Sequence, residues 1–251
     1  MVTGTLAKAG YFMGDNLWDA REANPKGFFE DIEVNKLNED ILEPIIPRRI
    51  YIRGARRFNL PKKYLFQHEP IRSQMWLSRI PINKPIKGNA RIDDHIFALV
   101  NKSPYCFKDP RFSYTLPVWR PHLKNVVFVC VFRDPATTVR SILKECSSIE
   151  YLNHEIRGIR IQWKHAMKTW TLMYQHILEK HRYSGNWLFM HYNQALTLEG
   201  LNKLEKFIQA PVDKEFPDSR IRRTFSTEPV PKRAKITYQK LCDLANYREE
   251  K

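Results

Sequence analysis

One stretch constrains the fold more than any other: the run from Asn125 to Phe132, which is apolar almost throughout and ends abruptly at Arg133. A strand that is apolar on both faces is typical of a parallel sheet covered by helices on both sides. Asp134 and Pro135 follow, and these residue types favour the N-cap and the first turn of a helix. The stretch therefore predicts a buried strand, a tight turn and a helix that continues to about Glu145.

Two further runs, Tyr105–Phe107 and Trp187–Met190, are also predicted as strands, since they are aromatic or apolar and end in polar residues. Helical patterns lie around these strands. Apolar residues at spacings of three and four predict a long amphipathic helix from Ile156 to His181, and shorter helices are expected over Val2–Lys8 and Leu198–Gln209. Strands that alternate with helices predict an α/β protein with a parallel sheet and βαβ crossovers.

The composition fits one domain with a sizeable core. The chain has 251 residues, 43% hydrophobic and 27% charged, which excludes an intrinsically disordered protein. No internal repeat or linker divides it, so we expect a single domain over residues 1–251. Residues 44–87 are rich in Pro, Arg and aromatic residues and lack periodicity. We interpret them as an irregular insertion over the substrate side of the sheet, with a flexible lid as the alternative.

Other features bear on the cellular location. No run approaches the roughly 20 apolar residues that a transmembrane helix needs, and the N-terminus lacks the pattern of a signal peptide. The four cysteines are far apart in the sequence and form no CxxC pair. This spacing favours reduced thiols over a disulfide framework or a zinc site. We therefore expect a cytoplasmic protein without a membrane partner.

The charge balance is strongly positive. Lys and Arg number 42 against 27 Asp and Glu, which gives a net charge of +15 and a pI near 9.7. Such a field favours polyanions, phosphorylated nucleotides or acidic surfaces, although a solvated basic surface without a specific ligand has the same composition. The basic residues are spread along the chain, with modest clusters only, and this argues against nucleic acid as the partner.

The strand end at Arg133 is the first candidate site. In open α/β sheets, ligands bind beyond the carboxyl ends of the strands, and a helix N-terminus at that place attracts anions. Ser141 follows eight positions after Arg133, in the predicted helix. A guanidinium fork and a hydroxyl can together bind one phosphate. The alternative is an arginine in a surface salt bridge and a serine that faces solvent.

Four stretches, taken in order, resemble the sulfotransferases that use 3′-phosphoadenosine 5′-phosphosulfate (PAPS). Residues Val131–Pro135 with Ser141 are similar to the motif that binds the 3′-phosphate. Asn24–Asp31 is similar to the substrate-side segment of bacterial members, and Lys108–Trp119 to one of their strand-end signatures. Met190–Asn193 resembles the strand end whose tyrosine contacts adenine. The resemblance implies a P-loop NTPase-like three-layer sandwich, with a central parallel sheet flanked by helices.

The sequence departs from the family at one place. It has no Lys or Arg followed by Ser-Gly-Thr, the loop that cradles the 5′-phosphosulfate, and Met1–Ala7 looks like the helix that should follow that loop. We expect that the start site was placed too late or that the sequence is truncated, with a non-transferring relative as the alternative. A Gly-Lys-Ser/Thr loop is also absent from the sequence, which argues against a P-loop kinase.

The resemblance also implies catalytic residues. Transfer needs a base for the acceptor's proton, and relatives place a carboxylate where this chain has Glu30, with Asp31 as the second choice. Both acids can instead belong to the first turn of a helix that runs from Ile32 to Glu43. Cytosolic relatives use a histidine, for which His95 is the candidate.

Several cations and one aromatic residue complete the candidate site. Lys108 can face the leaving phosphate, or the stretch that contains it can be a salt-bridged turn. Tyr192 can stack on adenine, or it can be an ordinary core residue. By analogy with relatives, a C-terminal basic segment closes over the 3′-phosphate, and the candidates for it are Arg222, Arg223, Lys232 and Arg233.

The resulting hypothesis is a sulfotransferase that moves a sulfonyl group from PAPS to a hydroxyl or amine of a small metabolite or sugar and releases PAP (3′,5′-adenosine bisphosphate). No HExxH or close Cys/His cluster is present in the sequence, and this chemistry needs no metal. We expect residues 44–87 to line the acceptor pocket. The alternative hypothesis is a basic, non-catalytic module that binds a nucleotide or nucleic acid.

Overall fold

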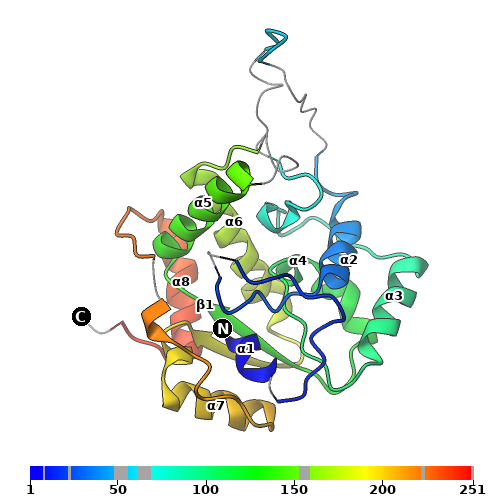
Figure 1. Cartoon of the computed structure of the whole chain (residues 1–251), viewed down its shortest axis with the longest axis vertical. Helices are drawn as coiled ribbons and strands as arrows, with labels where there is room; N and C mark the ends of the chain where they lie inside the picture. Colours follow the sequence, from blue (N-terminus) through cyan, green and yellow to red (C-terminus); the bar gives the residue numbers. More distant parts are fainter. Residues whose placement is uncertain are drawn as a thin grey trace.

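Two parallel strands organise the rest of the chain (Figure 1). The computed structural model describes residues 1–7, 9–21, 24–47, 56–61, 69–152, 159–221 and 224–249. Strand β1 (Val127–Phe132) pairs with β2 (Asn186–His191) in parallel, with Val127 opposite Asn186 and Phe132 opposite His191. The pairing continues for one more step, because the Tyr192 backbone N–H donates to the Phe132 carbonyl at 2.7 Å.

Side chains that alternate along the strands enter two different core clusters, so helices cover both faces of the pair (Figure 1). Cys130, Phe132 and Phe189 pack on one face with α5 (Pro135–Leu152), α6 (Trp163–His176) and α8 (Lys232–Ala245). On the other face, Leu188 and Met190 pack with α1 (Val2–Ala7) and α7 (Leu198–Ile208). This alternation is the reason why β1 is apolar throughout, and it confirms the prediction of a strand buried on both faces.

A separate cluster joins three further helices, α2 (Ile32–Leu42), α3 (Ala90–Val100) and α4 (Phe112–Trp119). Its largest buried side chain is Trp119, and α4 also packs against α6. Helix α6 continues into a π-helical turn, Ile177–His181. The remaining short elements are 3-10 turns at Met75–Leu77, Arg120–His122, Gln194–Leu196 and Ser219–Ile221.

The strand predicted at Tyr105–Phe107 is wrong. Tyr105 forms only a single parallel bridge with Phe12, in which the Phe12 N–H donates to Pro104 O at 2.8 Å and the Cys106 N–H to Phe12 O at 2.9 Å. Pairing stops there because Pro104 has no N–H and because the other segment turns at Gly14, whose φ is +128°. Among the described residues the sheet therefore has two strands, and the molecule is a mixed α/β protein.

Most of the predicted helices are present in the structure. The predictions at the start of the chain and at Leu198 are confirmed over α1 and α7, and α5 extends beyond its predicted end to Leu152. The helix predicted over Ile156–His181 is confirmed from Trp163 onward, but residues 159–162 are not helical, and Ile156 lies outside the described residues. Gln162 explains this start, because it closes a capping box with His165 in the first turn of the helix.

Residues 44–87 contain little regular structure where they are described, and their role as an insertion on the substrate side stays a prediction. Within the described parts of residues 44–87, the 3-10 turn Met75–Leu77 is the only helix or strand. No helix in the described parts of the chain combines the length and apolar character that are needed to cross a bilayer.

Candidate functional site

Arg133 and Tyr192 meet at the carboxyl end of the strand pair. Each is the first residue after its strand, and parallel strands in register end at the same edge of a sheet. The Arg133 guanidinium carbon lies 4.8 Å from the centroid of the Tyr192 ring. Arg133 Nη2 also donates to the Thr224 carbonyl at 2.6 Å. The structure thus brings together two of the three residues predicted to bind a nucleotide, and both are half-buried.

Ser141 does not join this pair. It lies in the second turn of α5, where six steps from Pro135 along an α-helix correspond to about 9 Å. Its side chain is exposed, and its hydroxyl makes no hydrogen bond to any residue that the structure describes. The role of Ser141 as a phosphate ligand stays a prediction.

The N-terminus of α5 is capped by the chain itself. Asp134 Oδ1 accepts a hydrogen bond from the Thr137 N–H at 2.7 Å, and the Thr138 hydroxyl donates to the Asp134 carbonyl at 2.8 Å. The cap confirms the predicted start of the helix. It also places a carboxylate at the positive end of the helix dipole, where an anion would otherwise bind. An anion at this edge therefore depends on Arg133 more than on the first turn of α5.

A hydrogen-bonded aromatic cluster, which the sequence did not indicate, lies beside this edge. The buried His191 ring stacks on Tyr247, with a centroid distance of 3.8 Å and an interplanar angle of 14°. His191 Nδ1 accepts from the Asn193 N–H, and its Nε2 lies 3.2 Å from the Tyr238 hydroxyl. That hydroxyl donates to Glu249 at 2.6 Å, and burial together with Glu249 raises the pKa of Tyr238.

Asn193 follows Tyr192 at the same strand end. Its side-chain N–H donates to the Tyr247 hydroxyl at 2.8 Å, but its buried Oδ1 has no hydrogen-bond partner among the described residues. A buried carbonyl oxygen without a donor is unfavourable. This oxygen is therefore an unsatisfied acceptor next to Tyr192 in the described part of the chain.

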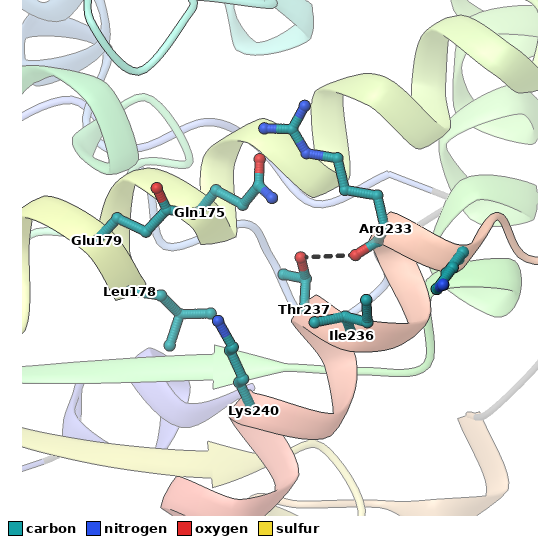
Figure 2. Close-up of a pocket in the computed structure, with 8 residues that line it drawn as sticks. Gln175, Leu178, Glu179, Arg233, Ile236, Thr237 and Lys240 are labelled. Atoms are coloured by element: carbon teal, nitrogen blue, oxygen red, sulfur yellow. Dashed lines mark hydrogen bonds between the residues drawn. The ribbon is translucent and has the colours of Figure 1, made fainter.

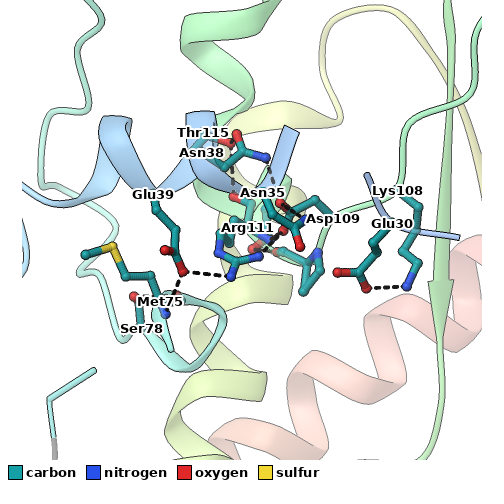
Figure 3. Close-up of polar contacts among 12 residues, drawn as sticks. Glu30, Asn35, Asn38, Glu39, Met75, Ser78, Lys108, Asp109, Arg111 and Thr115 are labelled. Atoms are coloured by element: carbon teal, nitrogen blue, oxygen red, sulfur yellow. Dashed lines mark hydrogen bonds and ion pairs between the residues drawn. The ribbon is translucent and has the colours of Figure 1, made fainter. Parts of the chain in front are cut away.

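Glu30 and Lys108 form an ion pair (Figure 3), with Lys108 Nζ donating to Glu30 Oε1. The Glu30 side chain is 14% exposed and that of Lys108 is 36% exposed. Burial raises the pKa of Glu30; Lys108 opposes this shift and the Asp109 carboxylate adds to it. A carboxylate with a raised pKa is a stronger base, so the environment of Glu30 suits proton abstraction.

The two other candidate bases have different surroundings. Asp31 is 2% exposed. It caps α2, since Oδ1 accepts from the Val34 N–H at 2.9 Å and Oδ2 from the Asn16 N–H at 3.0 Å. Both carboxylate oxygens of Asp31 therefore accept hydrogen bonds that stabilise the fold. This agrees with the alternative interpretation that these acids begin the next helix. His95 lies on α3 and pairs with Glu33 at the surface.

The residues after Lys108 form a buried ionic network (Figure 3). Arg111 donates to Glu39 at 2.8 Å and to Asp109 at 3.1 Å, and each of the three side chains is at most 5% exposed. Asp109 also accepts hydrogen bonds from Asn35 and Asn38 of α2. Asp109 and Arg111 therefore form a salt-bridged turn, which was the alternative interpretation of this stretch. The ion pairs and hydrogen bonds of this network attach the turn to α2.

Two of the four candidate C-terminal cations, Lys232 and Arg233, are described by the structure. Lys232 and Arg233 start α8 and line a pocket of about 320 Å³ between α8 and α6 (Figure 2). Neither Arg133 nor Tyr192 lines this pocket, so the structure does not show these cations closing over the candidate phosphate site. Arg222 and Arg223 lie outside the described residues.

The structure shows no candidate metal site in the described parts of the chain. No group of three or more His, Cys, Asp or Glu side chains there can hold a metal ion. The four cysteines are free thiols, and burial raises the pKa of Cys106 to about 12, which keeps it protonated at neutral pH.

Comparison with protein-family models, curated proteins and solved structures found nothing that matches this chain.

Proposed function

We propose that the chain is a PAPS-dependent sulfotransferase with a P-loop-like three-layer α/β fold, acting on a hydroxyl or amine of a small metabolite or sugar. The observation that carries the proposal is the pairing of Arg133 with Tyr192 at the carboxyl edge of two parallel strands. This is the edge at which α/β proteins bind nucleotides. The four motif resemblances in the sequence support the same assignment.

The residues at this edge suit the adenosine end of the donor. A guanidinium hydrogen-bonds in its own plane, so Arg133 can stack on Tyr192 and still bind a phosphate. The Tyr192 ring offers a surface to a purine.

Glu30 and Lys108 are the residues that we assign to the reaction itself. PAPS supplies the sulfonyl group. Glu30 accepts the proton of the acceptor hydroxyl as the acceptor oxygen bonds to sulfur, and Lys108 neutralises the negative charge that the phosphate of PAP gains as its bond to sulfur breaks. Their ion pair holds the two side chains together before the substrate binds. The chain has no Ser-Gly-Thr loop for the 5′-phosphosulfate, so Lys108 is the cation that we assign there.

The test is calorimetric titration of PAP into the wild type and Arg133→Ala. Loss of a charged hydrogen-bonding group costs about 1.5–3 kcal/mol, so we expect binding to weaken roughly 10- to 100-fold. Arg140→Ala is the matched control, because Arg140 is an exposed α5 residue that pairs with Glu228 at 3.5 Å. Unchanged PAP affinity in a folded Arg133→Ala protein would refute the site.

Two further measurements separate the proposal from its alternative. Labelled PAPS with a panel of alcohols, phenols, amines and sugars tests transfer, and Glu30→Gln should abolish it while PAP still binds. A nucleic-acid module would instead prefer a polynucleotide, and its affinity would fall steeply with salt concentration.

A further inference from the structure

The pocket between α6 and α8 has the charges of an anion site (Figure 2). Three cations line it, Lys232, Arg233 and Lys240, together with one acid, Glu179. The side chains of these four residues form no ion pair with any residue that the structure describes. Their charges are therefore not neutralised within the described protein, and the lining carries an excess of positive charge.

Helix α8 adds to the positive field. Its N-cap is Pro231, which supplies no side-chain hydrogen bond, and its first turn contains no acidic residue. Lys232 and Arg233 instead lie at the positive end of the helix dipole, an arrangement that disfavours cations. An anion bound at this place would relieve both the uncapped N–H groups and the repulsion among the cations.

An independent observation points to a ligand in the same pocket. Gln175 of α6 is 8% exposed, and its Oε1 has no hydrogen-bond partner among the described residues. Figure 2 shows its amide directed from α6 toward Arg233 on α8. A buried carbonyl oxygen needs a donor, which an inorganic anion such as sulfate does not provide.

We propose that this pocket binds a small phosphate or sulfate monoester that also carries a hydroxyl group. The ester anion lies among Lys232, Arg233 and Lys240, and the hydroxyl donates to Gln175 Oε1. Leu178 and Ile236 contact the carbon skeleton between them. The volume of about 320 Å³ falls at the lower end of small-molecule sites, which fits a sugar-sized ligand. The proposal does not depend on the sulfotransferase assignment.

Calorimetry with glucose 6-phosphate, glucose 6-sulfate and glucose tests the proposal. We expect one or both esters to bind and neutral glucose not to bind, and the two ester arms identify which anion the site prefers. The double substitution Arg233→Ala/Lys240→Ala should weaken ester binding about tenfold, since each exposed charge contact contributes modestly. Lys235→Ala is the matched control, because Lys235 is a cation of the same helix that does not line the pocket.

Gln175→Leu tests the second contact. It should weaken binding of the sugar ester without lowering the melting temperature of the free protein, because it removes a buried oxygen that has no partner. Arg133→Ala should leave ester binding unchanged, so this proposal and the proposed function fail separately. The proposal is overturned if neither ester binds, if glucose binds equally well, or if the double variant and Lys235→Ala behave alike.

Discussion

Replacing Arg111 should destabilise the fold more than replacing any surface arginine. Its guanidinium lies between Glu39 at 2.8 Å and Asp109 at 3.1 Å, and the residue is only 4% exposed. Arg111→Met keeps much of the side-chain volume but leaves two buried carboxylates without their cation. Breaking a buried ion pair from one side costs about 3–5 kcal/mol. This is a large part of the roughly 5–15 kcal/mol that stabilises a typical protein.

Arg72→Met is the matched control. Arg72 also bridges two carboxylates, Asp40 at 2.5 Å and Glu43 at 2.7 Å, but its side chain is 46% exposed. Water and salt screen such pairs, so we expect a loss below about 1 kcal/mol. Any difference between the two variants therefore reports the effect of burial on a similar set of contacts.

Urea unfolding, followed by tryptophan fluorescence, measures both variants. With a slope near 3 kcal/mol per M, the loss predicted for Arg111→Met corresponds to a midpoint lower by about 1–1.7 M, against less than about 0.3 M for Arg72→Met. Equal shifts in the two variants, or an Arg111→Met protein as stable as the wild type, would refute the argument that desolvation makes this network critical.

Three further predictions concern single side chains. Burial lowers the pKa of His181 to about 4, so the unfolded chain takes up a proton before the folded chain as the pH falls. The free energy of unfolding of the wild type should therefore fall by up to about 3 kcal/mol between pH 6.5 and 4, as measured by urea titrations across that range. The decrease should be smaller for His181→Asn. Asp31→Ala should cost about 1–2 kcal/mol by thermal unfolding, because it removes the cap of α2. Tyr192→Leu should weaken PAP binding about three- to tenfold by calorimetry, through lost stacking, and unchanged affinity would count against a contact with adenine.

The sequence predicts best where the cause is local. The alternation of β1 between two apolar faces and the cap at Asp134 depend on neighbouring residues, and both are confirmed. The meeting of Arg133 with Tyr192 also follows from the sequence, because parallel strands end at one edge. The Tyr105 strand failed because its pairing depended on a distant segment that turns away at Gly14.

Contacts between distant elements could not be predicted in this way. Asp109 and Arg111 belong to a motif whose sequence is compatible both with a binding signature and with a salt-bridged turn. The hydrogen bond from Arg111 to Glu39, which is distant in the sequence on α2, supports the salt-bridged turn. The same is true of Gln175. Its buried oxygen without a hydrogen-bond partner indicates a binding site only because α8 places cations in the same pocket, opposite α6.

The same reasoning explains why a net charge of +15 does not by itself locate a binding site. A cation that two carboxylates already neutralise gains little from a ligand anion, because two ion pairs must break for one to form. Arg111 is neutralised in the core and Arg72 at the surface. Lys232, Arg233 and Lys240 differ, because their side chains form no ion pair with any residue that the structure describes. This argument favours the α8 pocket as a place where anions bind, and it predicts that added salt weakens binding there.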